Sequence, residues 1–269
     1  MKRVNICLIF ILAAIGINAF GFGDSPILKR SIDSKKSKAG LVIVFDEKDH
    51  QFSGAEKQLI ENIIVSSEKK VRALLPSLPE NIKVTLIAID RNIDIVGGVS
   101  GRADAPGEVI IEISKVFPGG ITAASKTGLS TTVFHEFHHL SRGWTINGNK
   151  FEQGISIAVI NEGLAVVFAE IYTGVKQEGN SYTNEAAKWA TEILSLPKDA
   201  NYAEWMFEHP DGRTAIGYRT GNYIIHQAIA NSGKTILELS KLSPDEIWKL
   251  AGYDGTVKND SAEAGLPTQ

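Results

Sequence analysis

The spacing of hydrophobic residues changes along the chain and predicts a strand, a helix and a second strand first. Leu41–Asp46 and Ile82–Asp90 are short runs rich in β-branched residues, typical of buried strands. Between them, apolar residues recur at helical spacing over residues 59–75. Ser53 and Glu56 precede this run with the spacing of a capping box, so we expect the helix to begin there.

The next segment predicts a β-hairpin and the rest of the chain predicts helices. Gly97–Gly101 and Glu108–Ser114 flank the turn-rich segment Arg102–Gly107. Beyond Pro118 the apolar spacing becomes helical, and we expect helices near residues 123–142, 153–173, 184–195, 213–231 and 244–251. The fold class is therefore α+β, with a small sheet and helices followed by a mostly helical C-terminal half.

The last helix carries the clearest start signal of the C-terminal half. Ser243 is a good N-cap, Pro244 suits the first helical position, and Glu246 completes a capping box.

The N-terminus has the layout of a secretory signal peptide. Lys2 and Arg3 precede twelve apolar residues, Ile6–Ile17, and small residues follow up to Gly23. We expect residues 1–23 to be a signal peptide, 24–39 a flexible leader, 40–254 a single domain and 255–269 a flexible tail. The alternative for the first segment is an uncleaved membrane anchor, although the apolar run is short for a bilayer. We therefore expect export to the periplasm or medium, and no stable membrane insertion after cleavage.

Composition narrows the possible partners and the possible metal ligands. The chain has 269 residues, 43% hydrophobic and 22% charged, which is ordinary for a globular protein. Its net charge is −3 and becomes −5 without residues 1–23, so we expect no nucleic-acid partner. Cys7 is the single cysteine and lies in the expected signal peptide. Any zinc in the mature protein must then bind His and carboxylate side chains, which is more typical of hydrolytic than of structural sites.

The segment around residue 136 carries the chemistry. His135 and His139 are four residues apart, so on a helix both imidazoles share one face and can bind one zinc ion. Glu136 lies between them, as in the HExxH motif, in which the glutamate acts as general base. The alternative is a histidine-rich helix packed in the core or at the surface.

A catalytic zinc site usually needs a third protein ligand. Glu162 lies in the strongly apolar helical stretch 155–171, where a charge is costly to bury unless a cation pairs with it. It could instead face solvent, and Glu170, two turns further on, is a competing acid of lower rank.

Taken together, these segments resemble a gluzincin metallopeptidase. More narrowly, residues 135–142, 162–165 and 217–225 resemble a bacterial family known as predicted zinc-dependent proteases, over about residues 80–232. The resemblance implies a zincin-like fold, Zn²⁺ as cofactor and a peptide or protein as substrate. It also implies an edge strand against which an extended peptide pairs, for which Glu108–Ser114 is the candidate. The position one turn after Glu162 is Val166, so the surroundings of the ligands are undefined.

The resemblance also implies a Tyr or His that stabilises the oxyanion. Tyr218, Tyr223 and His226 are the candidates in the helix near 213–231, with Tyr223 slightly preferred. Each could instead be a packing residue.

The sequence thus predicts an exported zinc metallopeptidase and leaves two alternatives open. One is a non-catalytic exported module that binds zinc or a partner through a degenerate protease fold. The other is a metallohydrolase acting on a different amide, such as a cell-wall peptide crosslink. The oligomeric state is not predicted.

Overall fold

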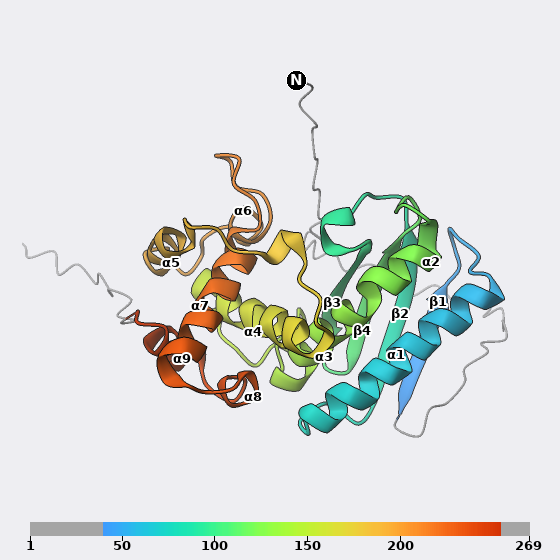
Figure 1. The fold of residues 1–269 in the computed structure, drawn as a ribbon, viewed down its shortest axis with the longest axis horizontal. Helices are drawn as coiled ribbons and strands as arrows, with labels where there is room; N and C mark the ends of the chain where they lie inside the picture. The colour runs from blue at the N-terminus through green and yellow to red at the C-terminus, as the bar shows by residue number, and fades with distance from the viewer. Residues whose placement is uncertain (1–39, 254–269) are drawn as a thin grey trace, which may run out of the picture.

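A computed structural model describes residues 40–253 and has the α+β architecture expected (Figure 1). The strands are β1 (Leu41–Asp46), β2 (Ile82–Ile89), β3 (Val99–Ala105) and β4 (Glu108–Ser114). They form one sheet in the order β1-β2-β4-β3. β1, β2 and β4 are parallel, whereas β3 pairs antiparallel with β4, so the sheet is small and mixed. The expected signal peptide, leader and tail lie outside the described residues.

The hairpin is confirmed, but two expectations about it were wrong. Arg102 lies within β3, because the turn is confined to Pro106 and Gly107. Glu108–Ser114 is also not an edge strand, since β4 lies between β2 and β3. The edge strand beside the helices is β3, because it pairs with β4 on one side and with no strand among residues 40–253 on the other.

Helix α1 (Gly54–Leu74) begins as the capping box predicts. The Ser53 hydroxyl accepts a hydrogen bond from the Glu56 backbone N–H, and the Glu56 carboxylate accepts one from the Ser53 N–H. Ile60, Ile64 and Val71 are fully buried in the hydrophobic core, and α1 packs against α3.

The helix predicted over 123–142 consists of three joined segments. These are α2 (Gly120–Ala124), a π-helical turn (Ser125–Leu129) and α3 (Ser130–Arg142). The wider turn contains Gly128, where an added Cβ would lie 2.7 Å from the Gly97 carbonyl oxygen. This close approach packs the helix backbone against the segment that precedes β3. The spacing of hydrophobic residues could not predict such a contact.

The C-terminal half contains the four predicted helices, α4 (Ile155–Thr173), α5 (Ala186–Leu194), α7 (Ile216–Ser232) and α9 (Pro244–Leu250). Ser243, Pro244 and Glu246 form the expected start of α9. The short helices α6 (Tyr202–Met206) and α8 (Ile236–Leu239) were not predicted, because single turns are too short for periodicity to reveal.

Helices α4 and α7 cross at a pair of glycines. A Cβ on Gly163 would lie 2.4 Å from the Gly221 carbonyl carbon, and one on Gly221 would lie 2.3 Å from the Val159 oxygen. The backbones therefore touch, and any side chain at either position would force the helices apart. This close packing explains the glycines at these two positions, which lie in the segments 162–165 and 217–225 that resemble the zinc-dependent protease family.

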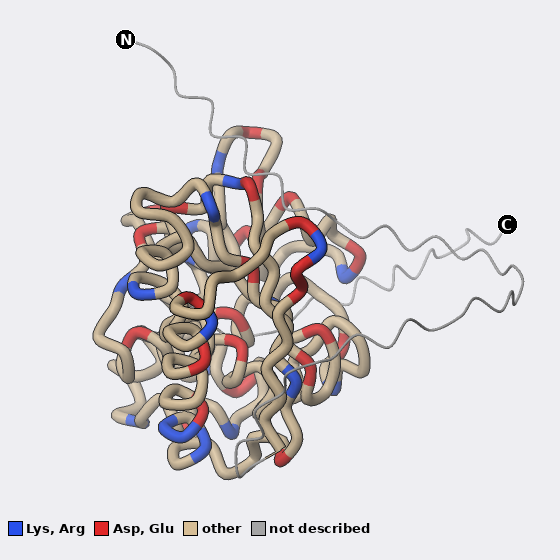
Figure 2. Tube along the Cα trace, turned by 90° about the vertical axis from the view of Figure 1, so that its right-hand side faces the viewer, with Lys and Arg blue, Asp and Glu red and all other residues tan. Residues whose placement is uncertain are grey.

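α4 is long and apolar enough to cross a membrane by length and composition. However, 72% of its most apolar window is buried inside the protein, between α3 and α7. Burial in the core therefore accounts for its hydrophobic sequence. Figure 2 shows that both basic and acidic positions are spread along the described chain.

Candidate metal centre

The histidines of the motif lie on α3, which packs between β3 on one side and α4 on the other. His135 and His139 are one turn apart, and their Nε2 atoms are 2.9 Å from each other. His139 is buried, whereas His135 keeps some contact with solvent. The expected placement of both imidazoles on one helix face is therefore present.

Glu162 on α4 completes the cluster. Its Oε2 lies 3.1 Å from the Nε2 atoms of both His135 and His139. Glu162 is 5% exposed, so it does not face solvent. Among the described residues these three form a group whose donor atoms could share one metal ion.

The charge and spacing of the three donor atoms suit a cation. Burial alone would raise the pKa of Glu162, but the His139 and His135 imidazoles hold that pKa below its usual range. A tetrahedral zinc ion with ligand distances of about 2.0–2.1 Å requires donor atoms separated by about 3.3 Å. The observed 2.9–3.1 Å separations are close to that requirement.

Trp144 holds the other oxygen of the Glu162 carboxylate. Its indole Nε1 donates a hydrogen bond to Glu162 Oε1 at 2.8 Å. Oε2 is thereby left directed at the histidines. Groups that orient metal ligands in this way tune metal affinity. The sequence did not predict this contact, because a donor from a loop 18 residues before its acceptor has no spacing signature.

Glu136 is buried beside the cluster. Burial raises the pKa of its carboxyl to about 7, against the lowering influence of His135. Its Oε2 has no hydrogen-bond partner among the described residues. A carboxyl group with a pKa near neutrality can accept and release a proton readily.

Gly101 of β3 makes room for Glu136. A Cβ at this position would lie 2.7 Å from Glu136 Cγ and 2.9 Å from its Oε1. The Thr132 hydroxyl also donates a hydrogen bond to the Val99 carbonyl, which ties α3 to the same strand. The missing side chain in β3 thus allows α3 to lie directly against the sheet edge.

The candidate oxyanion donors separate into two groups on α7. Burial and the negative charges of Glu162 and Glu136 raise the pKa of Tyr218 well above its usual value, and its ring lies 6.4 Å from the Phe207 ring. Tyr223 instead contacts the Tyr182 ring at 5.6 Å, and His226 Nε2 lies 3.9 Å from Glu170 Oε2. Because the two carboxylates act on its phenol, we propose Tyr218 as the oxyanion donor, whereas the sequence-based preference was Tyr223.

Tyr202 of α6 was missed by the sequence. Its side chain is 39% exposed, and its ring lies 5.9 Å from the Phe207 ring, which also contacts Tyr218. Because α6 is only about one helical turn between two loops, its sequence has no periodic pattern that could have predicted the contacts of Tyr202.

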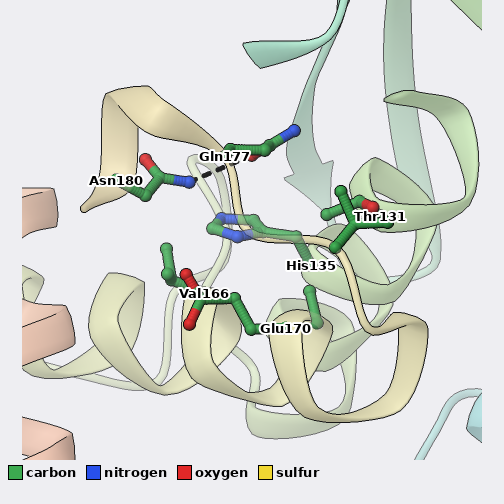
Figure 3. A pocket seen from close by; sticks show the side chains of 8 residues that line it. Thr131, His135, Val166, Glu170, Gln177 and Asn180 are labelled. Atoms are coloured by element: carbon green, nitrogen blue, oxygen red, sulfur yellow. Dashed lines mark hydrogen bonds between the residues drawn. The ribbon is translucent and has the colours of Figure 1, made fainter. Parts of the chain in front are cut away.

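A hollow borders the exposed side of His135 (Figure 3). It lies between α3, α4 and the loop that follows α4, and its lining includes Thr131, His135, Val166, Glu170, Gln177 and Asn180. Asn180 donates a hydrogen bond to the Gln177 side chain across the top of it. Glu170 is thus near the cluster but is not one of its three ligand candidates.

Comparison with known proteins now gives the family. The model of one family, described as "Predicted Zn-dependent protease (DUF2268)", matches residues 60–249. No curated protein and no solved structure matches significantly. The matched segment contains α3, α4 and α7, and so every residue of the cluster described above. The chain therefore belongs to the predicted Zn-dependent protease family, and its His135, His139 and Glu162 cluster is compatible with an HExxH-type zinc site.

Proposed function

We propose that the protein is an exported zinc metallopeptidase of gluzincin type with a zincin-like fold. The observation that carries this proposal is the convergence of three donor atoms within 3.1 Å, next to the buried carboxyl of Glu136. In this proposal His135, His139 and Glu162 hold Zn²⁺. A bound zinc ion supplies Lewis acidity, which lowers the pKa of a water molecule and polarises a carbonyl group.

The side chains around the cluster take the remaining roles. Glu136 accepts a proton from the attacking water and delivers it to the leaving amine. Tyr218 donates a hydrogen bond to the oxyanion that forms on the scissile carbonyl. Trp144 keeps the Glu162 carboxylate oriented through its 2.8 Å hydrogen bond.

β3 offers a surface on which an extended peptide could pair. Ser114 N–H bonds to the Gly98 carbonyl, so in this register residues 99, 101 and 103 point their backbone groups away from β4. The Val99 and Ala103 carbonyls already accept hydrogen bonds from the Thr132 hydroxyl and the Ile146 N–H, which leaves Gly101 as the position for a peptide. Gly101 places this edge beside Glu136. A peptide added here would present its backbone to the cluster by β-augmentation.

Two variants of the full chain test the proposal. Glu136→Gln should keep one zinc ion per chain, measured by mass spectrometry, and lose chelator-sensitive cleavage of casein or a peptide library. His139→Ala should lose both the metal and the cleavage. Full activity of the Glu136→Gln protein in a metal-dependent assay would refute the mechanism.

The same experiment separates the alternatives. One bound zinc ion without cleavage of any protein or peptide would favour a binding module with a degenerate protease site. Cleavage of a cell-wall peptide crosslink, but not of casein, would assign the site to a different amide. Secretion of the mature chain, with cleavage after about residue 23, tests the proposed export.

A further inference from the structure

Glu170 is a buried acid near the cluster that the proposed chemistry does not use. Its side chain is 7% exposed, and it lies on α4 eight residues after Glu162. Oε1 accepts a hydrogen bond from Asn222 Nδ2 at 3.1 Å, and Oε2 lies 3.9 Å from His226 Nε2. One neutral amide and a distant imidazole are weak compensation for a buried carboxylate.

The surroundings of Glu170 are short of hydrogen-bond donors. Asn222 directs its Nδ2 to both Glu170 Oε1 and the Asn180 carbonyl. Both acceptors need the amide in this orientation, which leaves Asn222 Oδ1 buried and, within residues 40–253, without a donor. A group that completes this environment must therefore bring N–H donors and, for Glu170, positive charge.

Two hollows share Glu170 in their linings. It lines the hollow beside His135 shown in Figure 3. It also lines a second hollow of about 230 Å³, together with Ser181, Tyr182 and His226. The hollow beside His135 has a volume of only about 10 Å³, room for one water molecule, so a ligand would reach Glu170 through the second hollow and not along the first.

Helix geometry gives the distance between Glu170 and the metal cluster along α4. Eight residues of α-helix rise about 12 Å, so Glu170 is offset by about that distance from Glu162 along α4. Extended peptide advances about 3.3 Å per residue. A cationic side chain within about three residues of the bond at the metal would thus be in range.

We propose that Glu170 is a specificity-determining residue that recognises a lysine or arginine side chain of the peptide substrate. This inference rests on the proposed peptidase function and adds the substrate class. Asn222 positions the carboxylate, and the second hollow receives the alkyl chain and cationic end of the substrate residue. Lys176 also lines that hollow, but it is exposed and forms no ion pair with Glu170 among the described residues.

The test uses peptide binding, so that it does not depend on cleavage. Zinc-loaded, full-length Glu136→Gln protein is titrated with library peptides that pair Lys or Arg with norleucine or glutamine at each position. We expect at least tenfold tighter binding of the basic peptide at one position. Adding Glu170→Gln, which keeps an acceptor for Asn222, should reduce that ratio to about two or less.

Glu178→Gln is the matched control, since it removes one exposed negative charge from the same loop. It should leave the ratio unchanged. Peptides with free and acetylated N-termini separate recognition of a side chain from recognition of a terminal amine, and dependence on the free amine would overturn the side-chain proposal. No basic preference at any position, no peptide binding, or an unchanged ratio in Glu170→Gln would each overturn it too.

Failure of the wider function has a different signature. If the wild-type protein cleaves nothing while the binding ratio still depends on Glu170, the inference stands and the peptidase assignment fails. If the wild type cleaves peptides without any charge preference, the peptidase assignment stands and the inference fails.

Discussion

At the scale of single residues, the centre depends on a few side chains that hold others in place. Glu162 has one carboxylate oxygen near the histidines and the other on the Trp144 indole. His138, between the two proposed ligands, is fully buried, and its Nε2 lies 2.8 Å from the Ser240 hydroxyl. Burial lowers the pKa of His138 well below its usual value, so this neutral imidazole anchors α3 instead of facing the metal.

Trp144→Phe should weaken zinc binding without removing a ligand. The ring remains, but Glu162 loses the donor that fixes its orientation, and changes of this kind typically cost 10–100-fold in metal affinity. Competition with a chromophoric chelator would measure the dissociation constant. Trp248→Phe is the control, because Trp248 also loses an indole bond, but to the Ser156 carbonyl, which is not a partner of any proposed metal ligand. Equal affinities for both variants would contradict the role assigned to Trp144.

Tyr218→Phe should lower kcat by about 10²–10³-fold while the zinc content stays at one ion per chain, because loss of one oxyanion donor has this effect in other hydrolases. Tyr223→Phe should retain wild-type kcat, since its ring contacts Tyr182 on another face of α7. Steady-state kinetics on one peptide substrate decides between them. A larger loss in Tyr223→Phe would restore the sequence-based preference.

At the scale of elements, the sequence predicted most of what is periodic and local. α1 and α9 begin at their predicted caps, because a capping box depends only on two residues three positions apart in the sequence. The HExxH motif likewise predicts His135 and His139 as neighbours, because they are only four residues apart on one helix. The edge strand, the π-helical turn and the Trp144 contact were not predicted, because each depends on which segments distant in the chain become neighbours. Tyr218 and Tyr223 share one helix, and only tertiary structure distinguishes them.

The contact between β3 and α3 can be tested with one methyl group. Gly101→Ala would place a Cβ 2.7 Å from Glu136 Cγ, so the base must move. We expect at least a tenfold loss of kcat with unchanged zinc content, since small displacements of reacting groups cost large factors in rate. Gly54→Ala, whose Cβ would meet nothing within 4 Å, should leave kcat unchanged. Wild-type activity in Gly101→Ala would show that this close approach is dispensable.

At the scale of the whole molecule, the proposed metal ligands connect the two halves of the fold. The histidines belong to α3, which packs on the sheet, and Glu162 belongs to α4, which packs on α7. α4 in turn touches α7 backbone to backbone at Gly163 and Gly221. The chain has a single cysteine, so no intrachain disulfide shares this task.

Removing zinc should therefore destabilise the entire protein. A ligand present at 100 times its dissociation constant stabilises the folded state by about 2.7 kcal/mol. For a protein of this size that corresponds to a fall in Tm of about 5–10 °C on chelation. Calorimetry with and without chelator measures the shift, and re-added zinc should reverse it. In His139→Ala the shift should disappear; an equal shift there would mean that the chelator acts elsewhere.

The loop after α3 has a further consequence for solubility. Ile146 and Asn147 donate backbone hydrogen bonds to the Ala103 and Asp104 carbonyls, at the far end of β3. The Thr132 hydroxyl occupies the Val99 carbonyl at the near end. An open strand edge is a template for unwanted pairing between molecules, and capping both ends leaves only a short stretch around Gly101 exposed. The same sheet edge can then accept a flexible chain briefly while resisting the continuous strand-to-strand growth that leads to aggregation.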